Sequence, residues 1–227
     1  MKKLVSFVLA LVMAASLLPV QAWGATVVAS GNCGNNGGNV TWTLDSDGVL
    51  TISGTGEMKD YVSSDSAPWY SQRKNIKNVQ ILDGVTSIGN SAFEFTSLTS
   101  VSIPNSVTYI GVRAFGYCRS LTSVSIPDSV TTIGACAFCF CSSLTSVTIP
   151  DSVTTIGEEA FSYCHSLTNV TIPSNVTSIE WGAFSGCSSL TSANIPDSVR
   201  YIDEYAFQYC SSLTSVNIPD SVRYIDK

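Results

Sequence analysis

The sequence predicts a β-rich solenoid, in which short repeats stack on one another and are joined by compact corners. Three observations predict it. The dipeptide Ile-Pro recurs every 23 residues, from Ile103-Pro104 to Ile218-Pro219. Ala-Phe recurs at the same step, from Ala114-Phe115 to Ala206-Phe207. Between them apolar and polar residues alternate, as in a half-buried strand. Because one such repeat has too few apolar groups to form a core alone, neighbouring repeats must stack.

The repeat that opens at Leu121 shows how each part is expected to fold. Val124 and Ile126 alternate with polar residues, which predicts a strand. This strand ends at Pro127, because proline has no N–H to give to a β-ladder. We expect a turn, a second short strand over 130–133, and then a compact corner of one 3-10 or helical turn that returns the chain to the next repeat.

The repeats occupy residues 76–227, as six complete units and one that breaks off at Lys227. The first unit is one residue shorter than the others. Each unit opens at a leucine or its equivalent, so the predicted fold class is a leucine-rich-repeat solenoid, with units opening at Ile76, Leu98, Leu121, Leu144, Leu167, Leu190 and Leu213. The half-built last unit predicts an exposed apolar end, which we expect to make the chain associate with itself.

Residues 26–75 do not repeat, and we expect them to form a cap on the amino-terminal end of the stack. Alternating apolar residues in 40–44 and 50–52, separated by a turn at 45–48, predict a β-hairpin. Residues 66–69, with proline near the first helical position, predict the start of a helix. A terminal unit of different sequence would cover the strand edges that an open solenoid end exposes.

Residues 1–25 are predicted to be a signal peptide that is removed on export. Lys2 and Lys3 supply its positive start, and residues 4–18 form an apolar run too short for a comfortable membrane span. We therefore expect a secreted or cell-surface protein with no membrane span after cleavage.

The net charge of −6 argues against a nucleic-acid partner, because such binding neutralises phosphates with Lys and Arg. Loss of both lysines with the signal peptide would make the chain more acidic still. The same acidity disfavours docking on anionic lipid.

Five of the eight cysteines share one repeat position and are expected to form a buried ladder of free thiols, comprising Cys118, Cys141, Cys164, Cys187 and Cys210. Stacked repeats would bring them within disulfide reach, but side chains in register point in parallel, which favours free thiols. Cys136, Cys139 and Cys141 crowd one repeat. A zinc site there would need a fourth ligand, for which the only histidine, His165, is one repeat away. We expect no metal and no other cofactor.

Catalysis lacks the necessary residues. Every scheme that needs a histidine would depend on His165, whose repeat position otherwise carries Arg or Ser, as on a variable surface. Glu158 and Glu159 are neighbours in sequence and cannot face each other across a glycosidic bond. We predict no catalytic residue and no enzyme.

Two outward sets of side chains are candidates for a binding surface. One is a column of aromatic residues, interrupted by Gly186, that comprises Phe95, Tyr117, Phe140, Tyr163 and Tyr209. Partial burial of these rings against the corner is the favoured alternative. The other is the outward row of the first strand, which includes Thr122, Thr145, Thr168 and Thr191. Threonine also simply suits a solvent-facing strand, and that interpretation is favoured for this row.

The repeat pattern Leu-x-x-Val-x-Ile-Pro-x-Ser-Val-x-x-Ile-Gly-x-x-Ala-Phe-x-x-Cys resembles that of BspA-like bacterial surface proteins, also called the Treponema pallidum type. The resemblance covers residues 76–227, and residues 31–56 resemble the leader segment found before such repeats. It implies a secreted or surface adhesion protein without catalysis. The implied partner is a host extracellular-matrix protein or another microbial cell. The alternative is a structural spacer, or a truncated fragment of a larger cell-wall protein with no binding activity of its own.

Overall fold

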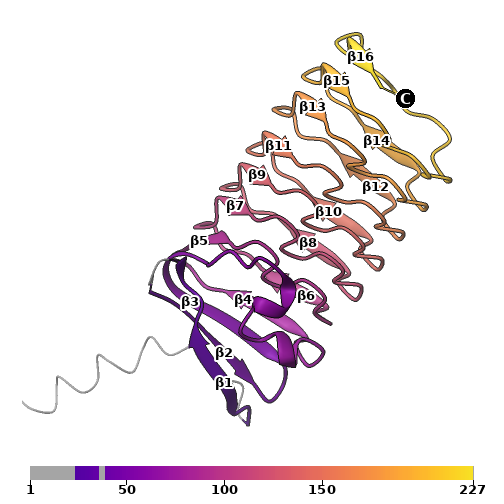
Figure 1. Ribbon diagram of the computed structural model, residues 1–227. Helices are drawn as coiled ribbons and strands as arrows, with labels where there is room; N and C mark the ends of the chain where they lie inside the picture. Colours follow the sequence, from indigo (N-terminus) through magenta and orange to yellow (C-terminus); the bar gives the residue numbers. More distant parts are fainter. Residues whose placement is uncertain (1–23, 36–38, 227) are drawn as a thin grey trace, which may run out of the picture.

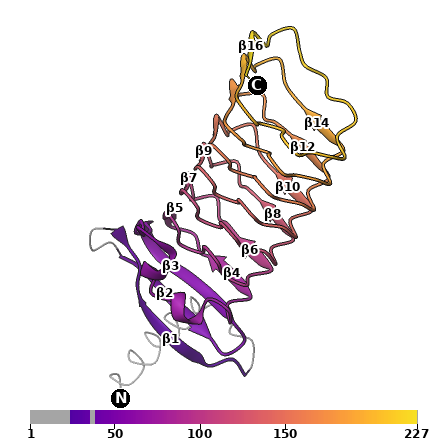
Figure 2. The same ribbon diagram turned by 45° about the vertical axis from the view of Figure 1, so that its right-hand side comes forward.

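The computed structural model describes residues 24–35 and 39–226, which form a stack of flat repeats with a small β-sheet at its amino-terminal end (Figure 1). All but two residues of the predicted signal peptide, 1–25, lie outside the described part of the chain. Within the described ranges, no helix has the length and apolar character needed to cross a membrane. The carboxyl end lies at the far end of the stack from the cap (Figure 2).

The predicted hairpin is present. It pairs β2 (Asn39–Asp45) with β3 (Val49–Glu57) in antiparallel register, and its inward residue Trp42 is buried. The turn between the strands is tied by Asp45, whose Oδ1 accepts from the N–H of Val49 at 2.9 Å. A further strand, β1 (Val27–Asn32), pairs with β2 along the outer edge. The sequence pattern did not predict β1, because almost all of its residues are exposed and do not alternate.

The cap sheet continues directly into the stack. Strand β3 pairs in parallel with both strands of the first repeat, β4 (Asn78–Ile81) and β5 (Val85–Ile88). The regular helix expected to start at 66–69 is absent: two 3-10 turns, η2 (Ser64–Ser66) and η3 (Tyr70–Gln72), flank this segment instead. Ala67 is extended, with φ −69° and ψ 134°. The residue before a proline is driven out of the helical region, so Pro68 separates the two turns.

Each later repeat but the last contributes two short strands, which run parallel to their counterparts on neighbouring rungs, and the last described rung contributes β16 (Tyr224–Ile225) alone (Figure 1). The first strands are β6 (Ser100–Ser102), β8 (Ser123–Ser125), β10 (Ser146–Thr148), β12 (Asn169–Thr171) and β14 (Ser192–Asn194). The second strands are β7 (Tyr109–Ile110), β9 (Thr132–Ile133), β11 (Thr155–Ile156), β13 (Ser178–Ile179), β15 (Tyr201–Ile202) and β16 (Tyr224–Ile225).

The register confirms the repeat length and its one short copy. Thr99 bonds to Lys77, 22 residues earlier, whereas Thr145 bonds to Thr122, 23 residues earlier. Identical repeat positions therefore lie above one another, and each apolar position becomes a continuous buried column. The leading residues from Ile76 to Leu190 are all fully buried.

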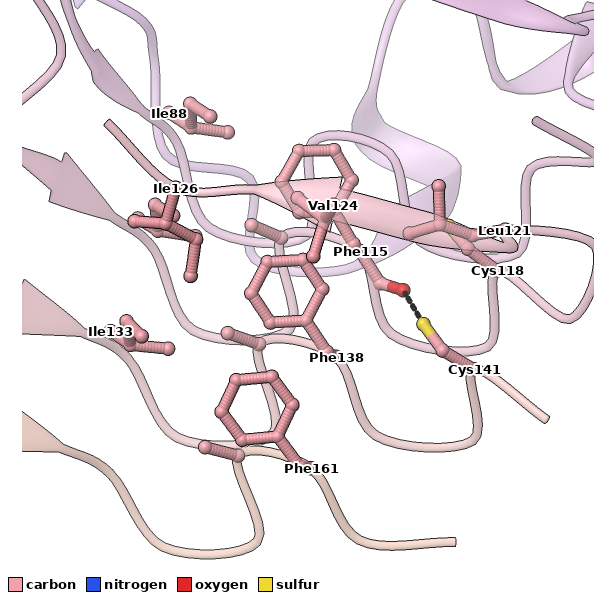
Figure 3. Close-up of a cluster of buried hydrophobic side chains, with 14 of the residues drawn as sticks. Ile88, Phe115, Cys118, Leu121, Val124, Ile126, Ile133, Phe138, Cys141 and Phe161 are labelled. Carbon is pink, nitrogen blue, oxygen red and sulfur yellow. Dashed lines mark hydrogen bonds between the residues drawn. The ribbon is translucent and has the colours of Figure 1, made fainter. Parts of the chain in front are cut away.

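The core is organised around a column of phenylalanine rings (Figure 3). Phe138 is fully buried, with ring centroids 5.2 Å from Phe115 and 5.3 Å from Phe161. At the cap, Trp69 stacks on Phe93 at 5.6 Å and donates from Nε1 to the carbonyl of Ala92 at 2.8 Å. The stacked rings of the core thus join the cap to the repeats.

The corners are compact, as expected, but consecutive turns build them in place of a regular helix. Cys136 and Phe140 have left-handed φ values of 55° and 57°, which break the helical path. As a result, alternate N–H groups point along the stack and donate to the following rung: those of Cys136, Phe138 and Phe140 reach the carbonyls of Glu158, Ala160 and Ser162, each at 2.8 Å. The corner is therefore a third hydrogen-bonded face of the stack.

The last described rung exposes apolar groups. Tyr224 is 67% exposed and Ile225 is 56% exposed. An open recess of about 360 Å³ lies between Ile202, Phe207 and Ile225. The expected self-association of the chain remains a prediction.

Candidate binding surface

Four aromatic rings from successive rungs stack outside the core. We call Phe95, Tyr117, Phe140 and Tyr163 the aromatic column. Their ring centroids are 4.5, 4.6 and 4.5 Å apart in sequence order, with interplanar angles between 6° and 21°. These separations are shorter than those of the core phenylalanine rings two residues earlier in each repeat.

Each ring of the aromatic column projects from a residue with left-handed backbone, with φ between 56° and 61°. That conformation costs a side-chain-bearing residue about 1–2 kcal/mol. It is held in place because the backbone N–H of each residue donates to the next rung: for Phe140 to Ser162 at 2.8 Å, and for Tyr163 to Ser185 at 2.7 Å. The backbone therefore fixes where each ring leaves the corner, and stacking fixes how it lies.

The aromatic column is partly buried, as favoured from the sequence. Tyr117, Phe140 and Tyr163 are of intermediate exposure, and Phe95 at the end of the row is 45% exposed. The fifth predicted member, Tyr209, is 67% exposed and does not stack on Tyr163, since Gly186 lies between them in the stack. The structure thus brings four of the five predicted aromatic residues together and leaves Tyr209 apart.

The predicted threonine row lies on the first-strand face and is exposed, but several of its hydroxyls are already engaged. Thr145 Oγ1 donates to the carbonyl of Thr122 at 3.0 Å, and Thr191 Oγ1 donates to that of Thr168 at 3.0 Å. These bonds tie one rung to the preceding rung. The geometry therefore supports a structural role for the row more than a role in recognition.

Charged side chains lie beside the aromatic column, in a grouping that the sequence analysis did not predict. Arg113, Cys136 and Glu159 occupy one repeat position on consecutive rungs, again with left-handed φ of 53° to 55°. Glu94 lies nearby with only 8% exposure; burial raises the pKa of its carboxyl, while Ser91 and Arg113 act to lower it. Burial is also the main cause of a raised pKa at Tyr117, with smaller contributions from the Cys139, Glu94 and Cys136 side chains.

A signal for both left-handed positions was present in the sequence. One repeat carries glycine at each of them, as Gly182 and Gly186, with φ of 58° and 73°. Glycine is the residue that adopts this conformation without cost. Reading those two glycines against the aligned repeats would have located both columns of side chains.

The cysteine ladder is confirmed, with all eight thiols free. Each ladder thiol donates to the carbonyl of a phenylalanine on the preceding rung; Cys141 Sγ, for example, lies 3.2 Å from the oxygen of Phe115 (Figure 3). Burial raises the pKa of the Cys118 and Cys164 thiols to about 12. Such thiols are poor nucleophiles and metal ligands.

The described residues contain no group of three or more His, Cys, Asp or Glu side chains placed to hold a metal ion. His165 is exposed, and its Nδ1 lies 3.0 Å from the carbonyl oxygen of Gly186. The Cys136, Cys139, Cys141 and His165 set considered from the sequence therefore does not converge on one point.

The chain matches the family model described as "BspA type Leucine rich repeat region", in six copies over residues 66–155 and 133–227. No curated protein matches it. Among solved structures, a leucine-rich repeat protein from Bacteroides ovatus is 30% identical, with a TM-score of 0.67, over 82% of this chain and 54% of that chain. The T. pallidum leucine-rich repeat protein is 26% identical, with a TM-score of 0.62, over 82% of this chain and 91% of that chain. This chain therefore spans about half the length of the first relative and most of the second.

Proposed function

The chain belongs to the BspA-type leucine-rich repeat family, and from this premise we propose that it is an exported, non-catalytic adhesion module whose aromatic column contacts a protein partner. Proteins of this family are commonly surface proteins, and the leucine-rich-repeat solenoid is typically a scaffold for protein interactions. The partners we favour are a host extracellular-matrix protein or a protein on another microbial cell.

The aromatic column is the observation that carries this proposal. Tyrosine is enriched among residues that dominate binding energy at interfaces. Here the rings are already held by their neighbours at 4.5 to 4.6 Å, so little side-chain entropy remains to be lost on binding. Each ring of this row projects from a residue with strained left-handed backbone. The core already has its own column of phenylalanine rings, so the partly exposed row is not needed to fill it.

The stacking also limits what the partner can present. Both faces of Tyr117 and Phe140 are covered by neighbouring rings, so these two residues offer ring edges to solvent. Ring edges carry the positive side of the aromatic quadrupole and pair well with aromatic faces. We therefore expect contacts from aromatic or aliphatic side chains of a protein. Affinity per site would be modest and would increase by multivalency on a surface.

A structural spacer is the second candidate, and the threonine row favours it. Hydroxyls that donate to the rung below, as those of Thr145 and Thr191 do, strengthen the stack and offer less to a partner. A spacer would need regular rungs and no recognition surface.

Binding of the purified chain to immobilised fibronectin, fibrinogen and whole bacterial cells separates the two candidates. The test variant combines Tyr117→Asn, Phe140→Asn and Tyr163→Asn, because asparagine tolerates left-handed backbone. The matched control is Tyr205→Asn, which removes an aromatic ring that is 40% exposed, has φ 61°, and lies outside the aromatic column.

Saturable binding by the wild type and by the control, with at least a roughly tenfold loss in the triple variant, supports the proposal. Circular dichroism spectra of all three proteins should superimpose. Equal binding by the triple variant and the control would move the site away from the aromatic column. No saturable binding by the wild type to any target would favour the spacer.

A further inference from the structure

Two cysteines, Cys136 and Cys139, lie outside the buried ladder and differ in exposure. Cys136 is partly exposed, whereas Cys139 is only 3% exposed. A turn joins them, closed by the N–H of Cys139 donating to the carbonyl of Cys136 at 3.0 Å. Residues separated in this way across a turn have Cα atoms within about 7 Å, which is compatible with a disulfide.

The repeat architecture does not require this pair. The other repeats place Ser91, Arg113, Glu159, Gly182 and Tyr205 where Cys136 stands. They place Glu94, Gly116, Ser162, Ser185 and Gln208 where Cys139 stands. Serine is thus an accepted residue at both positions. The ladder cysteines, by contrast, fill their position in five consecutive repeats as part of the core.

The surroundings distinguish the two thiols. Cys136 Sγ donates to Oε2 of Glu159 on the following rung at 3.2 Å, and Arg113 lies on the preceding rung. The neighbouring Cys139 thiol is the largest influence on Cys136 and lowers its pKa, and Arg113 adds to this effect. Burial and Glu159 oppose it. The neighbouring Cys136 thiol and burial raise the pKa of Cys139.

Access differs as well. Of the eight cysteines, Cys136 alone is not buried. The equivalent position to Cys139 on the preceding rung is Gly116, which places no side chain over the Cys139 sulfur; a Cβ there would lie 3.5 Å from it. A reagent can therefore reach Cys136 first, with Cys139 directly behind it.

We propose that Cys136 and Cys139 form a thiol–disulfide exchange site that accepts disulfide-bonded substrates. The Cys136 thiolate attacks one sulfur of a substrate disulfide, forms a mixed disulfide, and releases the first substrate thiol. Cys139 then loses its proton and attacks the Cys136 sulfur, which releases the second substrate thiol. The pair is oxidised by two electrons to an internal disulfide, the substrate disulfide is reduced to two thiols, and the two cysteine protons end on those thiols.

The location gives the exchange a structural consequence. Cys139 directly precedes Phe140 of the aromatic column, and both thiols influence the pKa of Tyr117. Closing a disulfide across this turn therefore constrains the corner from which the column projects. The exchange chemistry itself does not depend on the aromatic column binding a partner.

Oxidised glutathione is a suitable probe, added to the reduced, folded chain and followed by intact mass and peptide mapping. We expect the wild type to lose two hydrogens and to yield a peptide linking Cys136 to Cys139. The Cys139→Ser variant should retain one glutathione on Cys136. The Cys136→Ser variant should react at least roughly tenfold more slowly, because its remaining thiols are buried.

Serine occupies the equivalent positions in other repeats, so both variants should fold, which circular dichroism checks. If a variant does not fold, intact mass and peptide mapping of the wild type still decide between the outcomes. A glutathione that stays on Cys136 of the wild type would overturn the role of Cys139. First reaction at any other cysteine, or no reaction of the folded chain, would overturn the site.

Discussion

The ring of Tyr163 lies against the backbone of Gly186. A Cβ placed on Gly186 would lie 2.7 Å from Cδ1 of Tyr163, which is closer than real side chains approach. His165 packs edge-on against the same ring, with centroids 5.8 Å apart. The aromatic column therefore ends at Tyr163 because the next rung supplies backbone where the earlier rungs supply another ring.

Substitutions at Gly186 should distinguish backbone strain from stacking. Gly186→Ala should destabilise the chain by about 1–2 kcal/mol, because φ is 73° and the new methyl group meets the Tyr163 ring. Gly186→Tyr carries the same backbone cost but can stack on Tyr163 once that ring turns, which returns about 0.5–1.5 kcal/mol. We expect the tyrosine variant to unfold at higher denaturant concentration than the alanine variant. The opposite order would show that the Tyr163 ring cannot turn.

The two aromatic columns should differ in their importance for stability. Phe138→Ala removes a fully buried ring between two neighbours and should cost about 3–5 kcal/mol. Phe140→Asn, two residues away, removes a partly exposed ring and relieves left-handed strain at φ 57°. Its net cost should stay below about 2 kcal/mol. Urea unfolding monitored by circular dichroism measures both, and equal costs would contradict the division into a core and a surface column.

Alkaline pH should destabilise the folded chain through the cysteine ladder. Thiols in the unfolded chain ionise near pH 8.5, whereas burial raises the pKa of Cys118 and Cys164 to about 12. Above pH 8.5 the unfolded state binds fewer protons than the folded state, so stability falls as pH rises towards 12. Each such thiol contributes a slope of about 1.4 kcal/mol per pH unit. Denaturant midpoints measured under reducing conditions between pH 8 and 9 test this before most ordinary tyrosines ionise.

The Cys164→Ala variant is the control for this pH dependence. It should be less stable at pH 7 because it leaves a small cavity, but its stability should fall less steeply with pH than that of the wild type. Identical slopes would assign the alkaline loss to groups other than the ladder thiols.

The buried columns could be predicted from the sequence because stacking converts a period into a position. Once the 23-residue step is known, Phe138, Cys141 and Leu144 must each lie above its counterparts, and all three are fully buried. The hairpin was predictable for a similar reason, since Val40, Trp42 and Leu44 alternate towards one face.

The corner conformation was not predictable from its own residues. Phe140 and Cys136 carry no preference for left-handed backbone, which the inter-rung hydrogen bonds impose on them. Strand β1 could not be predicted, because an exposed edge strand has no buried face to create an alternating pattern. The local sequence therefore determined what is buried, while the neighbouring rungs determined how the candidate surface is shaped.

The threonine row provides the last prediction, because Thr145 tests whether its hydroxyl serves the fold or a partner. Thr145→Val keeps the branched shape but removes the Oγ1 donor to the Thr122 carbonyl, which still accepts the backbone N–H of residue 145 at 2.9 Å. Because this acceptor keeps one partner, the cost should be about 0.5–1 kcal/mol. Thr145→Ser keeps the donor and controls for loss of the methyl group.

Neither Thr145 variant should change binding to a target that the wild type binds, if recognition resides in the aromatic column. Interferometry on the same targets measures this directly. A loss of binding in Thr145→Val, retained binding in Thr145→Ser and unchanged stability in both would place recognition on the first-strand face. In that case the hydroxyls bound between rungs in the free chain, such as Thr145 Oγ1 at 3.0 Å from the Thr122 carbonyl, would have to exchange that bond for one to the partner.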